Sequence, residues 1–367
     1  MSVGTLSPRR TGAGVHARGA AAQGEVAQRA AGSRTRPLAG RWWARLAHQV
    51  TTRSGLRLAL GAVWLVDAIL QFQPAMFGPA FAHDVLAPAA AGQPRWVAEP
   101  VLHVVRLVEA APLLLNGVFA AVQLALGLAL LLRWRPRLVL GASVAWALGV
   151  WWLGEAFGGI FGGGATLLVG APGAALLYAV LAVLAWPPRV ARGGGSAGAS
   201  PGVAPRAGRA AWVGLWLIGA VLSVLPGAPS SRALAAEVAS GASGGPGWLV
   251  AFDRGVAHLV RSGGSPLAAG LVALEVAIGL AVLAGPRLAR LGLLAGALLA
   301  VAFWFTGQGL GAPWTGYATD VNLSPLVLLL ALGVASTFWC TGSPAERHAP
   351  RELGAATWSS AQGEGAA

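Results

Sequence analysis

Long apolar runs, separated by shorter polar segments that carry arginine, dominate this chain. A helix needs about 20 apolar residues to cross the hydrocarbon core of a bilayer, and backbone in lipid must hydrogen-bond to itself. The pattern predicts an all-α integral membrane protein. It has eight candidate transmembrane helices, at 56–73, 112–132, 138–157, 168–186, 211–226, 266–284, 291–309 and 323–340.

The pattern occurs twice along the chain. Trp64, Trp96, Gln123 and Gly127 are followed 152 residues later by Trp216, Trp248, Glu275 and Gly279, and Trp151, Gly154, Gly158 and Thr166 are followed 153 residues later by Trp304, Gly307, Gly311 and Thr319. A repeat of this length indicates a duplicated domain rather than a solenoid unit. Four spans return the chain to the side where it began, so we expect two parallel four-helix repeats that pack as a pseudo-dimer.

Composition divides the chain into five parts. Residues 1–54 are rich in Arg, Ala and Gly and lack the apolar core of a signal peptide, which predicts a disordered basic cytoplasmic tail. The first membrane repeat is expected at 55–186, a flexible Gly/Ser-containing cytoplasmic linker at 187–210 and the second repeat at 211–340. A second disordered cytoplasmic tail is expected at 341–367.

Charge sets the predicted orientation. Only 11% of residues are charged, against about a quarter in soluble domains, so the bilayer is the expected partner. The net charge of +13 lies between apolar runs and does not form the compact aromatic-interleaved face of a nucleic-acid-binding protein. With both termini cytoplasmic, the outer loops hold five arginines and the rest of the chain holds 21, as the positive-inside rule requires. We expect a multi-pass protein of a bacterial plasma membrane.

The long outer loops predict amphipathic helices at 95–110 and 247–262. One interpretation is that their charges simply face water. The other is that they form a polar rim over a shared opening, with His103, Arg106, Glu109, His258 and Arg261 as its candidate residues.

Polar residues within the predicted spans are candidates for a binding site, because charge at membrane depth is costly and usually faces a cavity. Asp67 lies near the middle of the first span, and its counterpart in the repeat is Gly219. Gln123 and Glu275 are counterparts in the second span of each repeat. A single interhelical hydrogen bond would also explain each of these two residues.

Each third span ends in a glycine-broken segment, WWLGEAFGGIFGGGAT or WFTGQGLGAPWTGYAT. Paired interruptions at equivalent places in two halves are typical of a binding or transport site, so Glu155 and Gln308 are the leading candidates, followed by Asp320 and Asn322. We expect Pro172 and Pro325 in the first turn of the fourth spans. The alternative is a tight helical corner without a ligand.

Motifs for catalysis and cofactors are missing from the sequence. Cys340 is the only cysteine, the sequence has no haem, nucleotide or metal motif, and no catalytic residue or metal ligand can be named. Whether the chain is an enzyme stays open.

The span plan, the long first outer loop and the Gly-Glu/Gln corner make each repeat resemble the DoxX/DoxD-like family of small membrane proteins. The resemblance implies a non-catalytic membrane subunit of a quinone-linked or oxidative-stress redox system, like the small subunit of thiosulfate:quinone oxidoreductase. It also implies a redox partner subunit and quinone as a cofactor. Two alternatives remain: a small-solute transporter or channel with its site at the outer corners, and a structural membrane scaffold.

Overall fold

The computed structural model describes residues 52–188, 203–225 and 230–339 of the 367-residue chain, all within one compact unit, His48–Ala367. We refer to 52–188 as the first half and to 203–339 as the second half. The predicted C-terminal tail, almost all of the N-terminal tail, the middle of the predicted linker and Cys340 lie outside the described residues.

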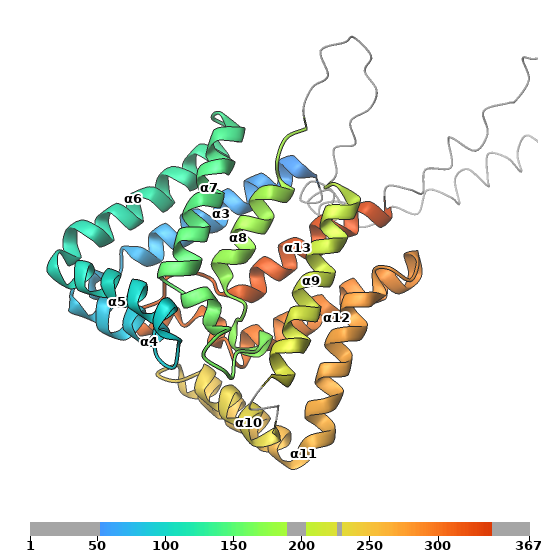
Figure 1. Cartoon of the computed structure of the whole chain (residues 1–367). Helices are drawn as coiled ribbons and strands as arrows, with labels where there is room; N and C mark the ends of the chain where they lie inside the picture. The colour runs from blue at the N-terminus through green and yellow to red at the C-terminus, as the bar shows by residue number, and fades with distance from the viewer. Residues whose placement is uncertain (1–51, 189–202, 226–229, 340–367) are drawn as a thin grey trace, which may run out of the picture. The chain divides into compact units, whose positions relative to one another are not determined.

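The described residues form helices and no β-strand (Figure 1). The first half contains α3 (Arg53–Gln71), η1 (Pro74–Phe77), η2 (Phe81–Leu86), α4 (Ala87–Ala89), α5 (Arg95–Ala110), α6 (Pro112–Leu131), α7 (Pro136–Leu153), η3 (Ala156–Gly159), η4 (Leu167–Val169) and α8 (Ala174–Leu184). The second half contains α9 (Pro205–Val224), α10 (Ser231–Gly241), α11 (Gly247–Ala281), α12 (Pro286–Phe305), η5 (Gly309–Gly311), η6 (Pro313–Thr315) and α13 (Leu323–Trp339).

Six of the described helices are long and apolar enough to cross a membrane: α3, α6, α7, α9, α11 and α12. The other two predicted spans correspond to the shorter apolar helices α8 and α13. The 11 residues of α8 would extend about 16 Å at 1.5 Å per residue, well short of the roughly 30 Å hydrocarbon core. The structure therefore has six membrane-length helices and two shorter ones where the sequence predicted eight spans.

Prolines mark where four of the long helices begin. Pro112, Pro136, Pro205 and Pro286 are the first residues of α6, α7, α9 and α12, a position where proline lacks only an N–H that would be unpaired anyway. Three of these helices start earlier than the expected 138, 211 and 291. Hydropathy alone misplaced these starts, because the helices continue past the apolar run into the arginine-bearing segment.

The helix predicted at 247–262 is present. It shares the label α11 with the following span, but the backbone at Gly264 (φ 63°, ψ −163°) leaves helical geometry, so α11 consists of two helices joined at a kink. In the first half, α5 and α6 are separate helices that meet at Ala111.

The short helices α8 and α13 form the centre of the packing (Figure 1). They contact each other, and both also contact α3 and α9; α7 packs on α8 and α12 on α13. Nearly all side chains of α8 are buried. By contrast, α6, α7 and α12 expose leucines such as Leu113, Leu138 and Leu298, which fits helices whose outer faces meet lipid.

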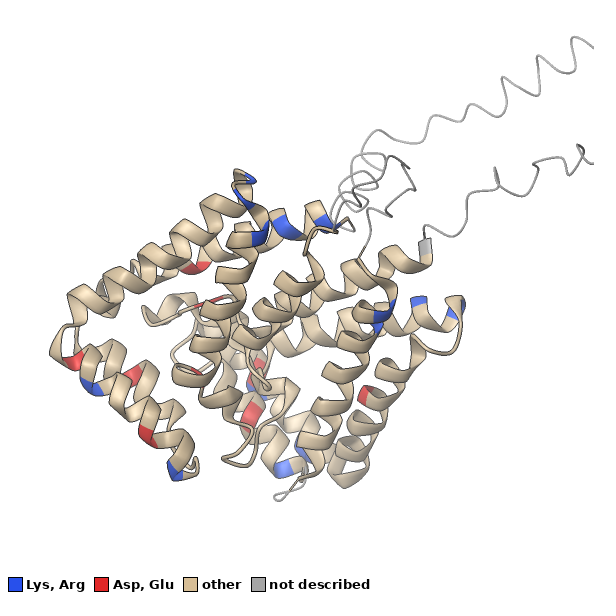
Figure 2. Cartoon of the chain, turned by 45° about the horizontal axis from the view of Figure 1, so that its top comes forward, with Lys and Arg blue, Asp and Glu red and all other residues tan. Residues whose placement is uncertain are grey.

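Arginines gather where α3, α7 and α12 begin (Figure 2). Arg53 and Arg137 donate to the carbonyls of Trp186 (3.3 Å) and Pro188 (3.0 Å) just after α8. Arg290 donates to the carbonyl of Phe338 near the end of α13 (3.2 Å). These contacts bring the arginine-bearing ends together with the carboxyl ends of the two central helices, where positive charge satisfies free helix carbonyls.

Candidate functional site

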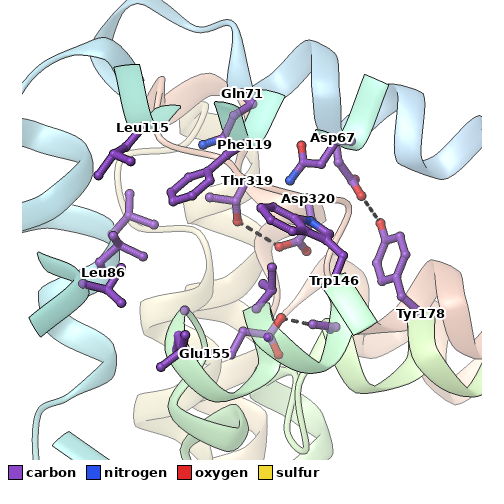
Figure 3. A pocket seen from close by; sticks show the side chains of 18 of the residues that line it. Asp67, Gln71, Leu86, Leu115, Phe119, Trp146, Glu155, Tyr178, Thr319 and Asp320 are labelled. Atoms are coloured by element: carbon purple, nitrogen blue, oxygen red, sulfur yellow. Dashed lines mark hydrogen bonds between the residues drawn. The ribbon is translucent and has the colours of Figure 1, made fainter. Parts of the chain in front are cut away.

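A cavity of about 390 Å³ lies among α3, α5, α6 and α7 (Figure 3). Helix η2, the first residues of α8 and the segment before α13 complete its walls. It brings together four of the predicted site residues, Asp67, Gln123, Glu155 and Asp320, although they come from four separate parts of the chain. The lining is otherwise mainly aliphatic and aromatic.

Asp67 projects from α3 into this cavity, and only 1% of its surface is exposed. The hydroxyl of Tyr178, on α8, donates a hydrogen bond to Asp67 Oδ2, while Oδ1 has no hydrogen-bond partner (Figure 3). Tyr178 also packs against Trp64, with ring centroids 4.3 Å apart, and the Trp64 indole donates to Ser143 Oγ (2.9 Å). The Asp67 side chain is therefore held in place by Tyr178, and the backbone N–H of Val321 lies near the same carboxyl without completing a hydrogen bond to Oδ1.

Glu155 lies two residues after the end of α7 and lines the cavity from the corner that leads to α8. Its Oε1 accepts the backbone N–H of Ala175, the second residue of α8 (3.0 Å), and Oε2 has no partner. Burial, and next the like charge of Asp320, raise the pKa of Glu155 to about 8. The N–H groups at the start of α8 oppose this rise by favouring the carboxylate.

The corner after Glu155 is a left-handed turn. Ala156, Phe157 and Gly158 have φ angles of 46°, 60° and 66°, a region that favours glycine. A Cβ atom on Gly158 would overlap the backbone of Pro172. The expectation that Pro172 lies in the first turn of the fourth span was wrong: α8 begins at Ala174 and Pro172 precedes it by two residues, where its carbonyl accepts the Trp151 indole N–H (2.6 Å).

Asp320 comes from the second half of the chain and reaches the cavity of the first. Its Oδ2 accepts the Thr319 hydroxyl (2.8 Å) and its Oδ1 accepts the backbone N–H of Asn322 (2.6 Å). Burial raises the pKa of Asp320, and these two hydrogen bonds partly oppose the rise. Asp67, Glu155 and Asp320 thus place three carboxyls in one cavity.

Gln123 contributes an unpaired acceptor to the cavity. Its residue is 8% exposed and its Oε1 has no hydrogen-bond partner. The neighbouring amide, Gln71, is already engaged: its Nε2 donates to Asn116 Oδ1, and Asn116 Nδ2 donates to the Gln71 carbonyl (3.0 Å).

Three predicted site residues lie outside this cavity. Gln308 is saturated by backbone groups, because Oε1 accepts from Ser324 N (3.1 Å) and Nε2 donates to the Leu167 carbonyl (2.9 Å). Asn322 accepts the N–H of Leu323 at the start of α13 (2.7 Å). Glu275 is 1% exposed on α11 beside Ser223 of α9, and its Oε2 has no hydrogen-bond partner. Gln308 and Asn322 therefore act in helix capping, and Glu275 in packing between helices.

The five candidates for an outer rim are exposed and none lines the cavity: His103, Arg106, Glu109, His258 and Arg261. These residues therefore do not form a rim of this cavity.

In each half, the corner between the third and fourth predicted spans contacts the other half. Thr319 lies in the cavity of the first half, and Thr166, its counterpart in the sequence, donates to Glu237 on α10 of the second half (2.8 Å). The residue after each threonine differs. Asp320 faces the cavity together with Asp67, whereas Leu167 packs onto Gly219, where an added Cβ would overlap the leucine side chain. The pair of Asp67 from the first half and Asp320 from the second thus corresponds to an apolar contact between Gly219 and Leu167.

Sequence reasoning missed several groups at this site. Tyr178 holds Asp67, and Trp146 lines the cavity with an indole N–H that has no partner. One signal was available: Tyr178 is one of only two tyrosines and sits inside an otherwise apolar run. Glu237 was also missed; burial raises its pKa, and the bond from Thr166 partly opposes this. Within the described ranges, no group of three His, Cys, Asp or Glu side chains could hold a metal ion.

Comparisons of the chain with protein families, with curated proteins and with solved structures found no match.

Proposed function

We propose that this chain is a multi-pass membrane protein of the small-solute transporter type, which binds a lipophilic molecule with a polar group in the cavity around Asp67. The observation that carries this proposal is the cavity itself. It combines a mainly apolar lining with three carboxyls and an amide, and its volume of about 390 Å³ lies within the roughly 300–1,000 Å³ of small-molecule sites.

The apolar side of the cavity supports access from the hydrocarbon core. Leu107 of α5 lines the cavity and is 49% exposed. Its neighbours in the wall, Val104, Leu115 and Phe119, are partly exposed and carry no polar side-chain atom. A solute that reaches the carboxyls past these residues must itself be largely apolar.

The proposal is tested by filling the cavity. Gly149 of α7 lines it, and a Cβ added there would have no atom within 4 Å, so we expect the ring of Gly149→Phe to occupy part of the cavity without a clash at its Cβ. Gly214→Phe is the matched control, since Gly214 of α9 has equally open space and does not line the cavity. We expect para-butylbenzamide to bind the wild type and Gly214→Phe in titration calorimetry, and Gly149→Phe to bind it at least about tenfold more weakly.

Proteoliposome uptake then distinguishes a transporter from a binding protein. Transport is supported if the wild type takes up para-butylbenzamide and Gly149→Phe does not. Binding without uptake would remove the transport part of the proposal, and equal binding by all three proteins would place the solute elsewhere.

A second candidate function is the one that the resemblance to DoxX/DoxD-like proteins implies, a non-catalytic membrane subunit that binds a quinone beside a redox partner. Glu155 favours it, because a carboxyl with a pKa of about 8 is protonated near neutral pH and can donate a hydrogen bond to a quinone carbonyl. Co-purification of a redox partner, with slower quinone reduction in membranes that lack this chain, would support it. Purification without a partner and unchanged quinone reduction would leave the transporter or the structural scaffold.

We further propose that the two halves are fused copies of one four-helix unit, that they pack as a pseudo-dimer, and that α8 and α13 complete eight membrane segments. Equivalent contacts support the duplication: α3 packs on α6 and α9 on α11, and α7 packs on α8 and α12 on α13. The corners agree in backbone detail, since residues 309–311 have φ angles of 48°, 55° and 78° and so match the left-handed run at 156–158.

The positions of the arginines support a cytoplasmic location for both termini in a bacterial plasma membrane. Arg53, Arg137 and Arg290 lie at the ends of helices that are held together by the contacts described above. Asp67 and Glu155 lie near or beyond the opposite ends of α3 and α7. In this orientation the cavity lies in the outer half of the membrane.

A further inference from the structure

We propose that the cavity selects a lipophilic organic cation that carries N–H donors, and that this cation binds in exchange for a proton. The inference rests on the proposed function and names the chemical class of its solute. Asp67, Glu155, Asp320 and Gln123 supply the polar contacts, and the aromatic side chains of the cavity supply the apolar ones.

The charge of the cavity is one-sided. Asp67 comes from α3, Glu155 from the corner after α7 and Asp320 from the segment before α13, and Tyr178 is the only other titratable group in the lining. The residues from η2, α5 and α6 in the lining are uncharged. Among the described lining residues none is an arginine, lysine or histidine. Buried carboxylates without a cation are costly, so a bound cation supplies the missing partner.

Charged groups on the neighbouring elements do not fill that role. His83 on η2 pairs with Glu109 on α5 at 3.6 Å, and both are exposed. The other charged or titratable residues on these two elements are exposed as well, and none of them lines the cavity: Asp84, Arg95, Glu99, His103 and Arg106.

The unpaired polar atoms point to a ligand that donates hydrogen bonds. Among the fully buried side-chain atoms of the described lining residues, Asp67 Oδ1, Gln123 Oε1 and Glu155 Oε2 are acceptors without hydrogen-bond partners, and Trp146 Nε1 is a donor without one. An amidinium, guanidinium or ammonium group brings several N–H donors to such a set. A ligand with acceptors alone would leave most of these oxygens unsatisfied.

The aromatic wall fits a cation with an apolar body. Phe119 lies 5.8 Å from Trp146 and 6.2 Å from Phe81 by ring centroids, and Trp64 lies against Tyr178. Ring faces attract an organic cation within about 6 Å. The carboxyls do not form a group that could hold a metal ion, and the cavity is far larger than one ion, so a molecular cation matches both its size and its chemistry.

Proton exchange follows from the same arrangement. Burial and the charge of Asp320 raise the pKa of Glu155 to about 8, and burial raises the pKa of Asp320. Near neutral pH a proton therefore neutralises part of the site, and an entering cation takes over this role and releases the proton to solvent. Affinity for the cation should rise with pH, by up to about tenfold per pH unit for each proton released.

The test uses the purified full chain in lipid nanodiscs and two probes of the same shape. The amidinium of para-butylbenzamidine stays charged through neutral pH, and para-butylbenzamide is its neutral counterpart. Titration calorimetry in buffers of different ionisation enthalpy reports affinity and proton release together. We expect the amidinium to bind at least about tenfold more tightly than the amide at high pH, to release a proton, and to weaken as the pH falls.

The variants separate this inference from the proposed function. Asp67→Asn and Asp320→Asn should each weaken the amidinium about tenfold or more while they keep amide binding, which also shows that they fold. Glu275→Gln removes a buried carboxyl outside the cavity and should change neither probe. Amide binding as tight as that of the amidinium, or amidinium binding without pH dependence, overturns the cation inference and leaves the lipophilic site. Failure of both probes to bind overturns both proposals.

Discussion

Glu155 and Gln308 make the same hydrogen bond in the two halves of the chain. Each accepts the backbone N–H of the second residue of the helix that follows it, Ala175 of α8 or Ser324 of α13. The same two corners share a second contact, because the indoles of Trp151 and Trp304 donate to the carbonyl two residues before each helix. The equivalence separates two roles: both residues cap a helix, and only Glu155 lines the cavity as a titratable group.

Replacing Glu155 by glutamine should therefore preserve the fold and alter its pH dependence. A carboxyl whose pKa is raised from 4.5 to about 8 in the folded state stabilises fully below pH 4.5, and this stability is lost as the pH rises toward 8. Wild type should thus unfold at a lower temperature at pH 8 than at pH 5, by roughly 2–4 °C for each kcal/mol lost. Glu155→Gln should have a flatter profile in thermal unfolding scans in detergent, with Glu99→Gln, which removes an exposed carboxyl on α5, as the control. A profile identical to that of the wild type would show that Glu155 is ionised throughout.

Glycine should be needed at Gly158 more than at Gly311. Both glycines have a positive φ, which costs other residues about 1–3 kcal/mol. A Cβ atom on Gly158 would also overlap the Pro172 backbone, whereas the nearest atom to a Cβ on Gly311 would be the Asp320 carbonyl oxygen at 3.1 Å. Thermal unfolding should show Gly158→Ala as the more destabilising change. Gly117→Ala, at an open position within α6, should be neutral or slightly stabilising. The reverse order of the two corner variants would contradict this geometry.

The carboxyl pair of Asp67 and Asp320 should be replaceable only as a pair. Gly219 accommodates Leu167 in the second half, so Asp67→Gly combined with Asp320→Leu copies that contact into the cavity. Each single change leaves a gap or crowds a carboxyl. We expect the double variant to be more stable than the sum of the singles by on the order of 1 kcal/mol, and to bind no amidinium. Additive effects on the free energy of unfolding would mean that these two side chains are not coupled.

Asn116 should matter to stability although it does not line the cavity. It is fully buried and exchanges two hydrogen bonds with Gln71, so Asn116→Leu leaves polar groups unpaired and should cost about 1–3 kcal/mol. Leu114→Ala, on the exposed face of the same helix, should cost far less. Adding Gln71→Leu to Asn116→Leu should restore part of the loss; no recovery would show that packing rather than hydrogen bonding explains the effect.

The orientation can be checked with single cysteines. In a Cys340→Ser background the chain has no other thiol. The variant His103→Cys then reports the side of the membrane on which α5 lies, and Arg135→Cys reports the side on which α7 begins. Both native residues are exposed. An impermeant maleimide should label the cysteine at 103 in intact cells and the one at 135 only after permeabilisation. Labelling in the opposite order would invert the proposed topology.

Sequence patterns alone predicted the helical class, the approximate positions of the apolar helices and the glycine-broken corners, and they missed α10. These features depend on local causes: the length of each apolar run, proline as the first residue of a helix, and glycine where the backbone φ angle is positive. The sequence also supplied four of the cavity residues, Asp67, Gln123, Glu155 and Asp320, because polar groups inside apolar runs are conspicuous wherever they lie.

Tertiary structure decided which of these residues meet. Asp320 is 253 residues from Asp67 in the numbering and reaches the same cavity because the corner of one half crosses into the other. Gln308 and Glu275 occupy the sequence positions that correspond to Glu155 and Gln123, yet only Glu155 and Gln123 line the cavity. Local pattern fixes what each segment can bury, whereas the packing of helices that are distant in the chain decides which polar groups are left without partners, and therefore where a ligand can bind.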